Sequence, residues 1–307
     1  MAEITQKDGR WSFDGAVLRI VPGHGRGVHG VRTRMGELVV PLATIAGVSH
    51  EAGRKRGRLR LRMRAGADPF TQATSGQLPD RADPYSLEVE AERAPLAEYL
   101  VDEVRNALLL DQVPVDTPTD RYLMPGPSVP LVLNGYDGKM HFDGERLRIE
   151  WGWATEEAKK AAGTRTIPLS DIEGVEWRRP NWEDGGLRLV PKGPHVPVKP
   201  SHDPFCVVTW GLREGRETAE LSMMAAAITA RLPHPHAAPA PPAAPAGEER
   251  VALAKGGAEE PPSPPPVASA DHDALLRRLR ELGELHQAGV LTDEEFSRAK
   301  QALLDRF

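Results

Sequence analysis

The sequence predicts a mostly β, α+β protein made of two tandem copies of one domain. Each copy is expected to be an antiparallel β-sandwich or barrel closed by a C-terminal helix. The first observation is repetition, because residues 9–15 (GRWSFDG) return as residues 138–144 (GKMHFDG). The second is a series of short strand-like segments in each copy, and the third is the amphipathic helix that ends it. A helix in that place would cover the open apolar end of the sheets.

Further landmarks recur in the same order and define the length of a copy. They are a Leu-Arg-Ile strand, a segment with Pro-Leu and Ile-x-Gly-Val, a Leu-Arg-Leu strand and an Asp-Pro-aromatic motif. Their positions are 18–20 and 147–149, 41–48 and 168–175, 59–61 and 187–189, and 83–85 and 203–205. A repeat of ~130 residues has the size of a whole domain. The duplication is an internal control, since a residue shared by both copies serves the fold and an unshared residue is free to serve function.

Copy one spans residues 9–111 and begins with short strands. We predict these strands over residues 16–21, 37–40, 45–49, 58–64 and 86–90. Residues 94–110 follow as a helix, because Leu96, Leu100, Val104 and Leu108 recur every four residues on one face. The copy therefore reads as many strands followed by one closing helix.

Copy two spans residues 135–232 and follows the same plan. Its closing helix is predicted near residues 217–232, and the buried positions are Leu221, Met224, Ala225 and Ile228. Residues 112–134 between the copies read as a linker, because five of the eighteen residues from 113 to 130 are proline.

Two further segments follow the second copy. Eleven of the thirty-eight residues from 233 to 270 are proline, a composition that predicts a disordered tether without a core of its own. Residues 271–307 regain a helical pattern and predict a hairpin of two helices, with a capping box at Thr292. Its apolar positions form a candidate association surface consisting of Leu275, Leu279, Leu282, Phe296 and Leu303.

These motifs carry two resemblances. Over about residues 9–232 the chain resembles an uncharacterised bacterial family of two tandem PH-like domains, on the Phe-Asp-Gly, Pro-Leu, Ile-x-Gly-Val and Asp-Pro-aromatic motifs. That resemblance implies a PH-like barrel or sandwich in each copy. Over about residues 275–304 it closely resembles the SHOCT (short C-terminal) module, on Leu-x-x-Leu, Gly-Val-Leu-Thr-x-Glu-Glu-Phe and Lys-x-x-Leu-Leu. That resemblance implies a module for association.

The basic run of copy one is the main candidate for an anion-binding site. Its members are Arg54, Lys55, Arg56, Arg58, Arg60, Arg62 and Arg64. Strand alternation places the last four on one face, away from the core. Guanidinium groups suit phosphate oxygens, so phospholipid headgroups, nucleic acid or an acidic partner are possible ligands. The alternative is a solvated strand face balanced by nearby acids; copy two keeps only Arg188 and Lys192 there.

Other motifs are interpreted structurally. Residues 25–30 match G-x-G-x-x-G, but strand-like residues 31–34 follow where a dinucleotide site needs a helix, so we predict a mobile hairpin loop. Cys206 lies in an apolar strand and reads as a buried, inert thiol. Asp14 and Asp143 precede glycine and read as turn residues. The ten histidines show no metal-binding spacing, and neither metal nor cofactor is expected.

Composition limits the possible functions. A net charge of −5 argues against a wholesale nucleic-acid binder, and a single cysteine rules out an intramolecular disulfide. No signal peptide or transmembrane segment is apparent, so a cytoplasmic protein is expected. We expect a non-catalytic interaction or adaptor protein that binds itself or another protein through residues 271–307. The alternative is binding to phospholipid or nucleic acid through residues 54–64, and an enzyme ranks third.

Overall fold

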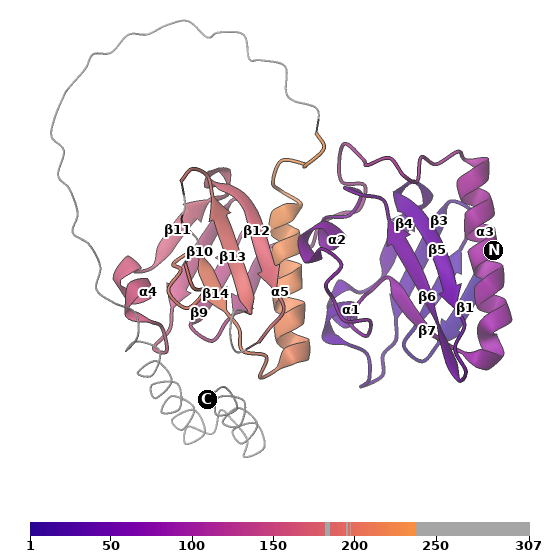
Figure 1. Ribbon diagram of the computed structural model, residues 1–307, viewed down its shortest axis with the longest axis horizontal. Helices are drawn as coiled ribbons and strands as arrows, with labels where there is room; N and C mark the ends of the chain where they lie inside the picture. Colours follow the sequence, from indigo (N-terminus) through magenta and orange to yellow (C-terminus); the bar gives the residue numbers. More distant parts are fainter. Residues whose placement is uncertain (182–184, 195, 197, 238–307) are drawn as a thin grey trace, which may run out of the picture. The chain divides into compact units, whose positions relative to one another are not determined.

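The computed structural model describes residues 1–181, 185–194, 196 and 198–237. The predicted tether beyond residue 237 and the predicted hairpin 271–307, with its five apolar association positions, lie outside the described residues. Copy one and copy two belong to one compact unit that extends from Met1 to Ala237. The fold is mostly β, as the sequence predicts (Figure 1).

Copy one contains a four-stranded and a three-stranded antiparallel sheet, followed by a long helix. The four-stranded sheet has the order β1-β2-β3-β4 and the three-stranded sheet the order β5-β6-β7. The elements are β1 (Ala2–Gln6), β2 (Gly9–Phe13), β3 (Val17–Pro22), α1 (Gly30–Met35), β4 (Leu38–Pro41), β5 (Ile45–Glu51), β6 (Arg56–Met63), α2 (Pro69–Thr74), β7 (Ser86–Glu90) and α3 (Ala94–Leu110). Short 3₁₀ turns, Leu42–Thr44 and Ala91–Arg93, precede β5 and α3.

Copy two repeats this order with β8-β9-β10-β11 in one sheet and β12-β13-β14 in the other. The elements are β8 (Leu131–Asn134), β9 (Gly138–Phe142), β10 (Arg146–Trp151), α4 (Glu157–Ala162), β11 (Arg165–Pro168), a 3₁₀ turn (Leu169–Asp171), β12 (Ile172–Arg178), β13 (Gly186–Pro191), β14 (Cys206–Val208) and α5 (Glu214–Thr229). The predicted duplication is confirmed. Each copy keeps two separate sheets, so a sandwich forms and a closed barrel does not. The first strands, β1 and β8, lie before residues 9 and 135, where the predicted copies begin.

The Phe-Asp-Gly motif that recurs in both copies forms a turn between two strands. Asp14 Oδ1 accepts hydrogen bonds from the Ala16 and Val17 amides at 2.9 and 2.8 Å. Asp143 Oδ1 does the same for the residues two and three positions on, at 2.8 and 2.7 Å. These backbone hydrogen bonds lower the pKa of both carboxyls. The following glycine has φ 107° in copy one and 111° in copy two, the left-handed region that favours glycine.

Helix α3 has the predicted bounds, but its buried face is rotated from the predicted one. Leu100, Val104 and Leu108 are buried as predicted, and the stripe is completed by Ala97 and Val101. Leu96 is 46% exposed, so its assignment to the buried face was wrong. The face follows positions i, i+3, i+4 and i+7, the 3.6-residue period of a helix, rather than a strict interval of four.

Helix α5 belongs to two cores. The predicted positions Leu221, Met224, Ala225 and Ile228 are all buried in the core of copy two. Ala219 and Ala226 lie in the core of copy one, because α5 also packs against α1 and α2. Small residues allow this close approach: a Cβ on Gly30 of α1 would stand 2.9 Å from the Gly215 carbonyl oxygen. The two copies are therefore joined by packing.

The segment predicted as a linker is ordered against copy one. The Leu123 and Met124 amides both donate to the Ala67 carbonyl, at 2.8 and 3.0 Å. Met124 is buried in the core of copy one. Prolines here give an extended segment that docks along the domain, and β8 begins the second copy within the predicted linker range.

Glu220 of α5 is a buried carboxylate that connects the copies. It accepts hydrogen bonds from Arg34 Nη2 of α1 at 3.1 Å, Arg216 Nε at 2.8 Å, and the Asn134 amide of β8 at 3.1 Å. Burial raises the pKa of Glu220, but the hydrogen bonds from Arg216 and Asn134 outweigh burial and hold the pKa below its usual value. The ionised form is thus the stabilising form.

Replacing Glu220 with glutamine should lower the free energy of unfolding at neutral pH by about 1.5–3 kcal/mol, the range for hydrogen bonds to charged groups. A depressed pKa contributes stability above the unfolded value of 4.5, and that contribution is lost as pH falls through the folded pKa. The gap between wild type and Glu220→Gln should therefore narrow below about pH 4.5. Urea unfolding across pH measures it, with exposed Glu173→Gln as the control. A gap that is constant with pH would contradict the assignment.

Candidate functional site

The arginine side chains of β6 lie on one face, as predicted. Leu59, Leu61 and Met63 alternate with them and are buried at 0%, 7% and 8% exposure. Arg56, at the start of β6, is exposed, and Arg54 and Lys55 are exposed in the turn before the strand. The alternation therefore divides the strand into a core face and a basic face.

Acidic neighbours balance much of this charge. Arg58 and Arg60 both reach the Asp80 carboxylate, at 2.9 and 3.1 Å, and Arg60 also lies 3.6 Å from Glu51. Arg56 pairs with Glu88 on the adjacent strand β7. The hydrogen bond from Arg60 lowers the pKa of Asp80. Three of the seven predicted anion-binding residues thus already have carboxylate partners.

Arg64 differs from the other members of the run. It lies just past β6, is 8% exposed, and donates to the Ala43 carbonyl at 2.8 Å and the Thr117 carbonyl at 2.9 Å. The prediction that it shares the exposed basic face was wrong, because the chain turns after Met63. Arg64 instead ties the segment after α3 to the domain.

Copy two shows whether the shared fold requires Arg62. Strand register pairs Ser49 with Arg60 and Glu176 with Arg188, so these two arginines are equivalent. By the same register, Gly47 pairs with Arg62 while Gly174 pairs with Val190. Arg62 therefore has no basic counterpart in copy two, and the fold does not require it.

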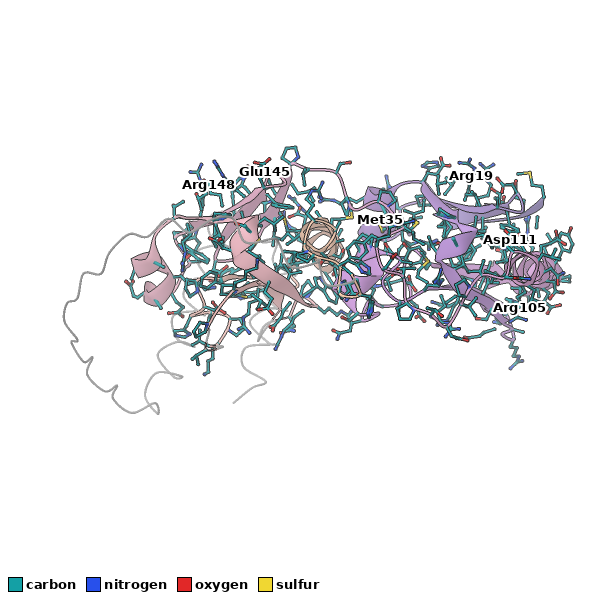
Figure 2. The ribbon with its side chains drawn as sticks, turned by 90° about the horizontal axis from the view of Figure 1, so that it is seen from above. Arg19, Met35, Arg105, Asp111, Glu145 and Arg148 are labelled. Atoms are coloured by element: carbon teal, nitrogen blue, oxygen red, sulfur yellow. The ribbon has the colours of Figure 1, made fainter. Side chains whose placement is uncertain are left out.

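Arg62 lines a cavity of about 790 Å³ in copy one. Strands β5 and β6, helix α2 and the end of α3 surround the cavity. Its apolar lining includes Leu61, Met63, Phe70, Leu78, Leu108 and Val115, and its polar lining includes Thr71, Thr74, Arg60, Arg62, Asp83 and Arg105. Arg105 comes from α3 (Figure 2). Sequence analysis identified Arg62 but gave no indication of this cavity.

Helix α2 forms one wall of the cavity and is positioned by Asp68. The Asp68 carboxylate caps the helix, accepting from the Phe70 amide at 3.1 Å and the Thr71 amide at 2.9 Å. It also accepts from the buried Tyr85 hydroxyl at 2.8 Å. Burial, followed by the charge of Asp68, raises the pKa of Tyr85 well above its usual value.

Copy two has no such wall in its described part. Among the described residues between β13 and β14 there is no helix, and a cavity beside Arg188 and Cys206 measures about 10 Å³. Arg188 Nε instead lies 2.7 Å from the Asp203 carboxylate, which is fully buried. The cavity of about 790 Å³ is thus lined by residues of copy one, and its wall α2 has no counterpart among the described residues between β13 and β14.

Each copy contains an ion pair between a buried basic side chain and an aspartate that sequence analysis did not find. In copy one, Arg32 Nη1 of α1 lies 2.8 Å from the Asp8 carboxylate, and Arg32 is 5% exposed. The Glu88 amide of β7 donates to the same carboxylate at 3.3 Å. Asp8 therefore connects the β1–β2 turn to the last strand of the other sheet.

Copy two repeats this arrangement with a lysine. Lys159 of α4 is fully buried and pairs with the Asp137 carboxylate, which also accepts from the Val208 amide at 2.9 Å. Lys159 Nζ further donates to the Cys206 carbonyl at 2.8 Å. The signal in the sequence is an aspartate directly before the shared glycine, at Asp8 and Asp137. Recurrence in both copies assigns the pair to the fold.

Two motif interpretations have different outcomes. Residues 30–35 form the short helix α1, so the predicted strand after G-x-G-x-x-G was wrong. His29 caps α1 by accepting from the Val31 amide at 3.3 Å, and packing on α5 stabilises the turn. The surrounding sheet is antiparallel, unlike a dinucleotide-binding unit. Cys206 is buried as predicted, and burial raises the pKa of its thiol to about 12.

The described residues contain no cluster of three or more metal-ligating side chains. Likewise, none of the helices described has the length and apolar character needed to cross a membrane.

Two family models match the chain. The model described as Domain of unknown function (DUF4429) matches residues 11–105 and 140–229, which correspond to the two copies. The model described as Short C-terminal domain (SHOCT) matches residues 277–304. None of the curated proteins matches the chain.

Proposed function

Because the chain belongs to the DUF4429 family, carries that domain twice and ends in a SHOCT match, we propose that it is a non-catalytic interaction protein. In this proposal the two copies, each with four strands, three strands and a closing helix in that order, are PH-like domains that act as a platform. The C-terminal module at residues 271–307 acts as the association element. The main support for this proposal is the SHOCT match at residues 277–304, which follows a compact unit that extends from Met1 to Ala237.

Physical size supports association by this module. A sequence of 37 residues is below the size that usually sustains a core alone, and each predicted helix is near the length at which isolated helices are marginal. Leu279, Leu282, Phe296 and Leu303 need an apolar surface to stabilise the predicted hairpin. A second copy of the same module supplies a matching apolar surface, so we propose self-association.

The ion pairs of β6 make its arginine side chains a weaker candidate for the functional surface than the C-terminal module. Arg56, Arg58 and Arg60 have carboxylate partners and Arg64 is buried. Binding of phosphate there would have to displace these partners, which reduces the gain. We therefore favour association over an anionic-surface function.

Deletion of residues 271–307 should convert oligomers into monomers. Multi-angle light scattering at tens of micromolar measures the mass of the full chain and of the shortened chain. The matched variant Leu279→Ala/Phe296→Ala tests the apolar face without removing the tail, and it should also be monomeric. A full chain that is monomeric under these conditions would overturn self-association. High salt should leave the oligomer intact, because apolar association is not screened.

A further inference from the structure

The cavity of copy one combines the size and the lining of a small-molecule site. Its volume of about 790 Å³ lies in the usual range for ligand pockets. The walls contributed by Leu61, Met63, Phe70, Leu78 and Leu108 are apolar. Burying a hydrocarbon chain against such a lining is favourable, whereas a fully polar ligand would gain little binding free energy there.

Two arginines of the cavity lining approach carbonyl groups of strand β5. Arg62 Nη2 lies 3.4 Å from the Ala46 carbonyl and Arg105 Nε lies 3.2 Å from the Val48 carbonyl. Both side chains are exposed, and among the described residues no carboxylate lies within 4 Å of either guanidinium. The two carbonyls are two residues apart on β5, a spacing of roughly 7 Å. Both guanidinium groups therefore lie along the same stretch of β5, and each can donate charge-assisted hydrogen bonds to an anion.

The other charged groups of the lining are less suited to hold an anion. Arg60 is paired with Asp80 and lies 3.6 Å from Glu51. Asp83 accepts from the Tyr85 amide at 2.9 Å, and burial raises the pKa of its carboxyl although the nearby Arg60 opposes that shift. The anionic group of a ligand is therefore expected at Arg62 and Arg105.

Comparison of the two copies supports a functional role for Arg62 and the cavity of copy one. Val190 replaces Arg62 in the register of copy two, and no helix equivalent to α2 occurs among the described residues there. A Cβ on Gly47 would stand 3.8 Å from Arg62 Nη2, an ordinary van der Waals contact, so a side chain can be introduced beside Arg62.

We propose that the cavity of copy one binds a free single-chain amphiphile with an anionic head group, of the fatty-acid class. The hydrocarbon chain lies along Phe70, Leu78 and Leu108, and the carboxylate lies between Arg62 and Arg105. The site is independent of the association module, so deletion of residues 271–307 leaves ligand binding unchanged.

Displacement of the fluorescent fatty acid cis-parinarate from the full chain tests the proposal. Oleate should displace it from a single site, and Arg62→Gln/Arg105→Gln should weaken oleate at least tenfold. Oleyl alcohol has the same chain without the charge, so its displacement should be unaffected by that variant. Arg10→Gln/Arg26→Gln changes net charge equally at exposed positions outside the cavity lining and should bind as wild type.

Substitutions that fill the cavity provide a second test of the proposal. Gly47→Phe should abolish binding of both probes, whereas Gly174→Phe, at the equivalent position of copy two with nothing within 4 Å of its Cβ, should bind as wild type. Ser49→Phe, from a neighbouring lining residue, repeats the block if Gly47→Phe fails to fold. The proposal would be overturned if the wild-type protein bound neither probe, or if the blocked variants bound both probes fully. It would also be overturned if the loss of both arginines left the affinity for oleate unchanged.

Discussion

Replacing Lys159 with methionine should lower the free energy of unfolding by about 3–5 kcal/mol, the cost of leaving one member of a buried ion pair without its partner. Lys159 is fully buried and its amine contacts both the Asp137 carboxylate and the Cys206 carbonyl. Burial already raises the pKa of Asp137 despite the lysine beside it. Without Lys159 that pKa should rise further, so the variant should recover stability relative to wild type as pH falls.

Two further variants separate charge from packing. Lys160→Met changes the exposed neighbour, whose carboxylate partner is also exposed, and should alter stability by no more than about 0.5 kcal/mol. Lys159→Met/Asp137→Asn removes the buried charge while keeping an acceptor for the Val208 amide. This double variant should be more stable than Lys159→Met alone, as measured by urea unfolding. If it is equally unstable, lost packing rather than an unpaired carboxylate explains the effect.

Replacing Asp68 with alanine should lower the free energy of unfolding by about 1.5–5 kcal/mol. Loss of a helix cap contributes about 0.5–2 kcal/mol, and a buried hydroxyl left without its acceptor contributes about 1–3 kcal/mol. The cap belongs to α2 and the hydroxyl to Tyr85. Asp68→Asn keeps one of the two carboxylate oxygens as an acceptor and should cost less.

Hydrogen exchange locates the effect of Asp68. Amides of α2 should exchange faster in Asp68→Ala, while those of β9 and β10 in copy two should change only with global stability. Asp116→Ala removes an exposed aspartate and is the matched control. Thermal unfolding reports the loss of stability. Unchanged protection of α2 would show that packing against α5, rather than Asp68, positions the helix.

Local patterns predicted the repeated architecture well. Strand alternation at Leu59, Leu61 and Met63 and the bounds of α3 follow from periods of 2 and 3.6 residues, which any buried face imposes. The turns at Asp14 and Asp143 follow from hydrogen bonds within three residues. The DUF4429 and SHOCT matches confirm the two-copy family and the C-terminal module that the motifs resembled.

Features that depend on distant contacts were not predictable in this way. Residues 31–34 have a β-branched character, yet contacts with α5 hold them in a helix. The cavity depends on α2, whose position is fixed by Asp68 and Tyr85 across seventeen residues. The balance of charge on β6 depends on Asp80, which no strand pattern brings beside Arg60. Among these distant contacts, only the ion pairs of Asp8 and Asp137 left a recognisable pattern in the sequence, an aspartate before the shared glycine.

The sharing of α5 has a consequence for folding during synthesis. Ala219 and Ala226 complete the core of copy one, but they are translated more than 100 residues after α3 ends at Leu110. At about 5–20 residues per second, the ribosome takes on the order of 10 s to supply them. During that interval the faces of α1 and α2 that await α5 remain open to solvent or to chaperones. The duplicated domains therefore mature together, and the first copy reaches its native state only after most of the second has emerged.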